Sequence, residues 1–390
     1  MGVEQIKRHL TEDVIPFWKG LKDEKFGGFY GALDYKLKLH RKADKGCILN
    51  SRILWFFANA YLTLGDESCL KEADHAYEFL ENAFYDKENG GVYWSVTYNG
   101  KPSDTSKHTY SQAFAIYALA SYYAASRKKE ALELAYALVD RVEKFCKDEN
   151  GYLEAFDRRF RPVKNEKLSE NGVMAARTMN TLLHVFEAYT ELYRVDGKQD
   201  IANRMEWMLD LFAEKIYNPK ERRLEVFFDL DWKSLIDLNS YGHDIEASWL
   251  IDRGVEVLGN PVYEAKITLI TLELAAHIFE EAVDGASLYN ECEDGRVDTK
   301  KVWWVQAEAM LGFLNGYQKD GTRKEYLEAV GRIWNYIDQY MIDRREGSEW
   351  YNELNRDGTP IPGREIVGPW KCPYHNGRMC FEVIRRKIDF

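Results

Sequence analysis

The sequence repeats one pattern six times: an amphipathic helical stretch, a short turn rich in Gly, Asp and aromatic residues, and a second, more apolar helical stretch. The turns begin at Asp23, Asp86, Asp148, Asn218, Asn290 and Asp343. Their spacing of about 50 to 70 residues is the length of a helical hairpin with its connections. We therefore expect six consecutive helical hairpins.

The two halves of each hairpin differ in polarity. The segments after the turns are apolar over most of their circumference, with small residues and aromatics interleaved, as is typical of buried helices. They span residues 46–64, 107–126, 176–194, 243–258, 302–317 and 373–387. The segments before the turns, such as 3–21, 69–85 and 324–342, carry one apolar stripe among Lys, Glu and Asp. These outer segments should face water on one side.

Six inner and six outer helices favour an all-α fold, a closed (α/α)6 barrel with short β-ribbon turns at the end that holds the cavity. An open solenoid is the competing arrangement, but the units share no fixed repeat length or small-residue signature. The regular repeat and the absence of a Pro- or Gly-rich linker predict a single domain over residues 1–390, although length alone would allow two.

Charge and composition exclude several classes of partner. A formal net charge of -11 disfavours nucleic acid and anionic membranes, which require clustered positive charge. No apolar run approaches the length of a membrane span. The amphipathic N-terminal segment lacks a signal-peptide core, and the six cysteines form no CxxC pair. We expect a cytoplasmic protein, a monomer, with reduced and mostly buried thiols.

Polar side chains occur on all six inner segments, where a purely structural helix would carry none. They are Arg52, His108, Tyr110, Asn180, His184, His243, Glu246, Glu308, His375 and Arg378. A single buried histidine is more often a hydrogen-bonded core residue than a catalyst. Polar groups converging from six helices would cost too much desolvation unless they lined a wet pocket. The inner ring is therefore predicted to enclose a functional cavity.

A metal site in that cavity is disfavoured. The HxxE pair His243 and Glu246 is single and reversed relative to the motif of di-iron bundles. His184, His243 and His375 could in principle converge as three zinc ligands. We expect neither a metal nor another cofactor.

The predicted cavity residues suit a sugar. Trp249, Trp304, Trp370 and Tyr110 offer flat apolar faces, although aromatics dominate ordinary cores as well. Histidines exchange protons near neutral pH, and an arginine can stabilise an oxyanion. Two bases and an oxyanion stabiliser are what proton abstraction next to an aldehyde requires. Reprotonation at carbon 2 gives an epimer, and reprotonation at carbon 1 gives a ketose.

Six stretches of the chain resemble a known family. KHTYSQAFAIYALASYY, EAFDRRF, SENGVMAARTMNTLLH, GHDIEASWL, KVWWVQAEA and WKCPYHNGRMCFEV are similar to the cellobiose 2-epimerases of the N-acylglucosamine 2-epimerase superfamily. The resemblance covers essentially the whole chain and is specific in combination. It implies an (α/α)6 barrel that converts the reducing-end glucose of cellobiose, lactose and related β-1,4-linked oligosaccharides to mannose without a cofactor.

The same resemblance implies roles for individual residues. It pairs His243 and His375 as acid and base, and makes Arg52 the residue that stabilises a cis-enediolate. Residues that hold or flank the sugar are then Tyr110, Asn180, His184, Glu246, Trp249, Trp304, Glu308 and Trp370.

Three alternatives stay open at this point. An aldose-ketose isomerase of the same superfamily would use the same histidine pair. A glycoside hydrolase would need two cooperating carboxylates, which Glu246 and Glu308 could supply, but would leave the histidines unexplained. A sugar-binding protein without catalysis would need only the aromatics. Fold alone cannot decide among them.

Overall fold

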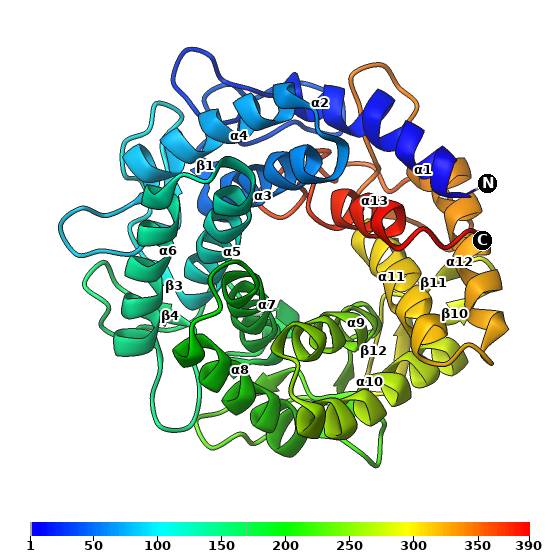
Figure 1. Ribbon diagram of the computed structural model, residues 1–390. Coiled ribbons are helices and arrows are strands. Elements are labelled where there is room, and N and C mark those ends of the chain that lie inside the picture. Colours follow the sequence, from blue (N-terminus) through cyan, green and yellow to red (C-terminus); the bar gives the residue numbers. More distant parts are fainter. Residues whose placement is uncertain (1, 169) are drawn as a thin grey trace.

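The computed structural model describes residues 2–168 and 170–390. Within them, the six apolar segments form a closed inner ring of helices, each in contact with the next and the last in contact with the first (Figure 1). The ring consists of α3 (Cys47–Leu64), α5 (Thr109–Ser126), α7 (Met179–Asp196), α9 (Tyr241–Leu258), α11 (Trp303–Lys319) and α13 (His375–Arg386). The predicted barrel is confirmed, and the solenoid is excluded.

The amphipathic segments form the outer ring. They are α1 (Gly2–His9) with α2 (Ile15–Lys19), α4 (Glu67–Phe79), α6 (Lys129–Arg141), α8 (Gln199–Leu211), α10 (Pro261–Glu281) and α12 (Lys324–Tyr336). The blue N-terminal helix lies beside the red C-terminal helix in Figure 1, and α1 contacts α13. Both ends of the chain therefore take part in closing the barrel.

Short antiparallel ribbons join successive hairpins at one end of the barrel. In the described part of the chain, a short strand precedes five of the six inner helices and pairs with a strand of the following hairpin. The pairs are β1 (Lys45–Gly46) with β2 (Ser95–Val96), β3 (Lys107–His108) with β4 (Ala155–Phe156), β5 (Arg177–Thr178) with β8 (Phe227–Phe228), β9 (Leu238–Asn239) with β12 (Glu291–Glu293), and β14 (Lys301–Val302) with β15 (Glu353–Leu354). A bridge between Leu33 and Val367 joins the first hairpin to the last. This stitching sets the inner helix N-termini around one opening.

Side chains in the first turns of inner helices hold the ribbons in place. The Oε1 of Gln112 accepts a hydrogen bond from the amide of Val92, and the Oε1 of Gln306 accepts one from Leu288. Buried ion pairs also recur, as between Lys45 and Asp23 at 2.7 Å. Because a buried charge is tolerated only with its partner, these pairs tie each ribbon to the ring.

Glycines end several inner helices, and π-helical turns, which hydrophobic periodicity does not predict, interrupt the outer segments. Helices α3, α7 and α9 stop at Gly65, Gly197 and Gly259, which adopt positive φ as glycine readily does at a helix C-terminus. Among the described residues, five outer segments contain a π-helical turn. These turns cover Leu10–Val14, Leu80–Phe84, Val142–Cys146, Phe212–Ile216 and Ile337–Met341. None of the described helices combines the length and the apolarity that a membrane span needs.

Candidate active site

A cavity of about 320 Å³ lies at the ribbon end of the barrel. It continues into a second lobe of about 230 Å³ that shares Tyr110, Asn180, His243 and Trp304 with it. These side chains belong to the first turns of four different inner helices. The inner ring itself therefore forms this part of the cavity wall. Seven residues predicted to contact a ligand line the first lobe together with Arg52: Tyr110, Asn180, His184, His243, Glu246, Trp304 and Trp370. His375 completes this set.

The two predicted acid/base histidines both pack against Trp304. Ring centroids are 4.8 Å apart for His243 and Trp304, and 5.4 Å apart for Trp304 and His375. The Nδ1 of His243 is 2.7 Å from the hydroxyl of Ser240, and the Nδ1 of His375 is 2.7 Å from Oε1 of Glu308. Since both Nδ1 atoms are engaged, Nε2 is the nitrogen that each ring has available for a ligand.

Both imidazoles are held in the neutral form. Burial lowers the pKa of His243 to about 4, against a smaller opposing effect of Glu246. Burial likewise lowers the pKa of His375 well below its usual range. A neutral imidazole has a free lone pair, which a general base requires. Each ring is therefore able to accept a proton at neutral pH.

Arg52 enters the cavity from α3 without a carboxylate partner. Of the described residues, no Asp or Glu forms an ion pair with it, although its side chain is buried. Its Nη2 donates to the hydroxyl of Tyr110 at 3.0 Å. A buried guanidinium surrounded by neutral groups keeps its full positive charge, so this part of the cavity attracts an anion.

A second buried arginine, Arg378, differs from Arg52 because carboxylates surround it. The guanidinium of Arg378 donates to Glu187 and to Glu308 at 2.6 Å each, and also to Glu246. Although burial alone would raise the pKa of Glu187, Arg378 holds it at about 2. Arg378 thus compensates the acidic groups beneath the cavity and fixes their positions.

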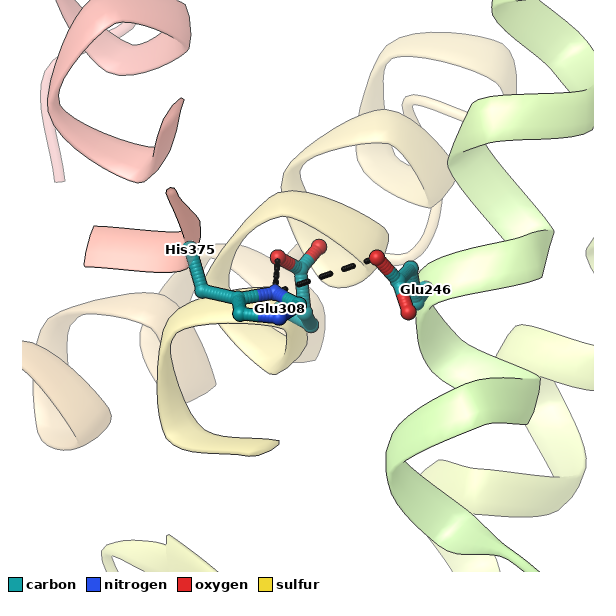
Figure 2. Close-up of side chains that lie close together, drawn as sticks. All are labelled: Glu246, Glu308 and His375. Atoms are coloured by element: carbon teal, nitrogen blue, oxygen red, sulfur yellow. Dashed lines mark hydrogen bonds and ion pairs between the residues drawn. The ribbon is translucent and has the colours of Figure 1, made fainter. Parts of the chain in front are cut away.

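Glu246, Glu308 and His375 cluster closely enough to hold a metal ion (Figure 2), with one ligand atom from each within 4.8 Å of the others. This set differs from the three histidines considered from the sequence. The Nη2 of Arg378 already bonds to both carboxylates. A cation is thus present at this position without a metal.

Asn180 and His184 form the α7 side of the wall. The Nδ1 of His184 is 2.9 Å from Oε2 of Glu187, and its ring packs edge-on against Tyr110. Within the described part of the chain, Oδ1 of Asn180 has no hydrogen-bond partner. That oxygen is available to a ligand hydroxyl.

Two predicted site residues do not lie on the cavity wall. Trp249 is buried behind it, and its indole Nε1 donates to Oε2 of Glu308 at 2.9 Å. Glu308 in turn lies behind His375. This placement differs from the predicted contact with substrate, because helical spacing identifies a shared face but not the distance of a side chain from the barrel axis.

Comparison with known proteins decides the family. A sequence model of the N-acylglucosamine 2-epimerase family matches residues 28–377, which is most of the chain. The chain belongs to the N-acylglucosamine 2-epimerase family. As a member, it is a carbohydrate epimerase or isomerase.

Relatives within this family are similar over their whole length. A cellobiose 2-epimerase of Ruminococcus albus is 52% identical over 389 residues, covering 100% of both chains. One from Dictyoglomus turgidum is 46% identical, with 98% of each chain covered. The solved cellobiose 2-epimerase of Bacillus thermoamylovorans B4167 is 48% identical, covers 98% of this chain and 99% of its own, and gives a TM-score of 0.96. These matches support epimerase activity.

More distant neighbours share the fold alone. A solved D-mannose isomerase has a TM-score of 0.83 at 20% identity. An α-1,6-mannanase from Salegentibacter has a TM-score of 0.64 at 15% identity. The barrel therefore supports different sugar chemistries, and the site residues must decide between them.

Sequence reasoning missed several residues of this epimerase site. Tyr374 packs beside His375 and donates to Oε2 of Glu187. Glu353 lines both lobes and pairs with Arg364 at 3.1 Å. In the sequence, Glu187 looks like an ordinary residue of an apolar helix, and Glu353 looks like an ordinary residue of a turn. A signal for Tyr374 was available, since it directly precedes His375 in the PYHNGR stretch.

Proposed function

We propose that this protein inverts carbon 2 of the reducing-end glucose of cellobiose, lactose and related β-1,4-linked oligosaccharides, producing a mannose end. The observation that carries the proposal is the pair His243 and His375, both lining one cavity beside the uncompensated Arg52. Relatives of high identity named cellobiose 2-epimerase support the substrate class.

The reaction begins with opening of the pyranose, assisted by a histidine acting as acid and base. One neutral imidazole then removes the proton from carbon 2. The electron pair delocalises onto the carbonyl oxygen of carbon 1, giving a cis-enediolate. Arg52 would stabilise that negative charge, because its own proton is never lost at accessible pH.

Inversion requires a second proton donor on the other face. Rotation about the bond between carbons 2 and 3 presents that face to the second imidazole. The first imidazolium gives its proton to an enediolate oxygen, and the second imidazole takes a proton from a hydroxyl of the resulting enediol. The imidazolium so formed returns this proton to carbon 2 before the ring closes, so both rings end neutral. His375 is supported by the carboxylate of Glu308, whereas His243 is supported by the hydroxyl of Ser240. A hydroxyl can donate or accept, so His243 can exist in either neutral tautomer.

The remaining wall residues would bind and orient the sugar. Trp304 and Trp370 present flat faces suited to the C–H face of a pyranose. Asn180, Glu246 and Tyr110 would bond its hydroxyls. The second lobe gives room for the sugar attached at the nonreducing side. Trp249 and Glu308 would act indirectly, by fixing the ring of His375.

The carboxylates do not favour hydrolysis. A glycosidase needs one carboxyl group on each side of the scissile bond, about 5 to 9.5 Å apart. Here Glu246 and Glu308 share one nitrogen of Arg378, and Glu308 lies behind His375. The pair cannot flank a glycosidic bond in this arrangement.

Incubation with cellobiose in D2O, followed by NMR, tests the proposal. We expect a glucosyl-mannose product carrying deuterium at carbon 2. Free glucose would identify a hydrolase, and a glucosyl-fructose product would identify an isomerase. The six cysteines, all of which the structure describes, are free thiols, which agrees with our proposal of a reducing, cytoplasmic location.

A further inference from the structure

The two buried arginines of the site are held in opposite ways. Arg378 is surrounded by three carboxylates, whereas Arg52 is held by neutral groups. The guanidinium centre of Arg52 lies 4.1 Å from the ring centroid of Phe114 and 4.5 Å from that of Tyr374, and these two rings contact each other edge to face. Aromatic faces attract a cation without cancelling its charge. Arg52 therefore sits in a neutral cage.

Cys372 contributes a sulfur to this cage. Nη1 of Arg52 donates to Sγ of Cys372 at 3.6 Å, and the thiol donates to the carbonyl oxygen of Trp370 at 3.5 Å. The side chain is fully buried. One thiol thus connects the guanidinium to the backbone of the rim residue Trp370, whose side chain is 38% exposed at the cavity.

The chemistry of sulfur suits a position beside a guanidinium that must stay unpaired. A thiol is a weak acceptor, so it orients Nη1 while competing little with an incoming anion. Burial raises the pKa of Cys372, an effect larger than the opposing one of Arg52. The thiol consequently stays neutral at physiological pH, and no thiolate neutralises the arginine.

Nε is a further hydrogen-bond donor of Arg52. It is buried and has no hydrogen-bond partner among the described residues. An unsatisfied buried donor normally costs stability and requires an explanation. A guanidinium with a free donor and an uncancelled charge is prepared for a ligand oxyanion.

We propose that Cys372 is a positioning residue, which orients Arg52 toward the enediolate oxygen, leaves its charge available and couples it to the Trp370 rim. This inference rests on the proposed function, because it assumes that a negative charge develops beside Arg52. A carboxylate at position 372 would form an ion pair with the guanidinium and remove that charge from catalysis.

The test compares Cys372→Ser, Cys372→Ala and Cys372→Asp with the wild-type protein. Each is assayed for kcat and KM with cellobiose, for the primary isotope effect of carbon-2 deuterium, and for thermal unfolding. Cys380→Ala is the matched control, since Cys380 is a buried thiol on α13 that does not line the cavity. It should leave kcat within about threefold of wild type, whatever it does to Tm.

We expect Cys372→Asp to lower kcat by about 100-fold or more, with KM changed by less than about threefold and an undiminished isotope effect, which is the scale of losing one oxyanion donor. Cys372→Ala should lower kcat by about tenfold, and Cys372→Ser should restore most of it because a hydroxyl can make both bonds. A purely structural role would lower Tm without this selective loss of kcat.

Retention of at least a third of wild-type kcat in folded Cys372→Asp would overturn the inference. Should that variant not fold, Cys372→Ala and Cys372→Ser decide: equal kcat in both, close to wild type, would also overturn it. If the wild-type protein exchanges no proton at carbon 2, the proposed function fails and takes the inference with it. If the wild type does exchange and Cys372→Asp is unimpaired, the inference alone fails.

Discussion

The Nδ1 of His375 lies 2.7 Å from Oε1 of Glu308, and this carboxylate is fully buried. A carboxylate behind an imidazole fixes the tautomer and stabilises the protonated ring that forms after proton abstraction. His375 therefore owes its orientation, and the support of its protonated form, to a residue that does not line the cavity.

Replacement of Glu308 by Gln should lower kcat by about 100-fold while leaving KM for cellobiose nearly unchanged, because the amide keeps the shape but loses the charge. Steady-state kinetics measure both constants. Glu353→Gln is the matched control on the cavity wall, and it should act mainly on KM. A Glu308→Gln variant with wild-type kcat would show that His375 works without the carboxylate.

Replacement of Arg378 by Met should destabilise the fold by about 3–5 kcal/mol, since Glu187, Glu246 and Glu308 would lose their shared counter-ion in a buried site. Urea unfolding followed by tryptophan fluorescence measures the loss. The control is Arg356→Met, which removes a largely exposed pair with Asp284. That change should cost no more than about 1 kcal/mol. Equal losses in the two variants would contradict the role given to Arg378.

The pKa of His243 makes stability depend on pH in a defined window. Burial lowers this pKa from its ordinary value of 6.5 to about 4 in the folded protein. Between those values the unfolded chain binds the proton more readily, so the free energy of unfolding should rise with pH from about 4 to 6.5. His243→Asn should reduce this slope in urea titrations at several pH values. An unchanged slope would mean that His243 titrates alike in both states.

The same shift predicts the acid limb of activity. A base with a pKa of about 4 stays neutral in weak acid, so kcat/KM should hold down to about pH 5 and fall below it. A pH–rate profile with cellobiose measures this limb, with activity restored on return to neutral pH as the check for denaturation. A fall centred near 6.5 would indicate a histidine with an ordinary pKa.

Trp370 should matter more to the outer sugar than to the chemistry. Its side chain is 38% exposed at the rim, and its ring lies 5.8 Å from that of Tyr110. Trp370→Ala should raise KM for cellobiose by about tenfold, as expected for the loss of one stacking face, and change kcat little. Trp232→Ala, at a partly buried tryptophan outside the cavity, is the control. A loss confined to kcat would refute the assignment.

The inner ring could be predicted from the sequence because fully buried helices are rich in apolar residues. Segments such as 47–64 and 109–126 are apolar on every side, which only an inner helix of a large protein tolerates. The strands that stitch the hairpins are two or three residues long, too short for a period-2 pattern to show. The π-helical turns also leave no sequence signal that helical periodicity could detect.

The site could be predicted only in part, because helical spacing shows which residues share a face but not which distant residues meet. His243 and Glu246 are three residues apart on one helix, and both lie on the cavity wall as that spacing suggests. Trp249 continues the same face but lies too deep to reach a ligand. The cage of Arg52 depends on Cys372, more than 300 residues away along the chain. No local pattern connects residues so distant in sequence.

The most direct test of the account follows the carbon-2 proton in His243→Asn and His375→Asn. Each variant is given cellobiose, and separately its glucosyl-mannose epimer, in D2O, and deuterium uptake is read by NMR. If the two imidazoles serve opposite faces, one variant should exchange the carbon-2 proton of cellobiose without inverting it, and the other should exchange that of the epimer alone. Epimerisation at the wild-type rate in either variant would contradict the account.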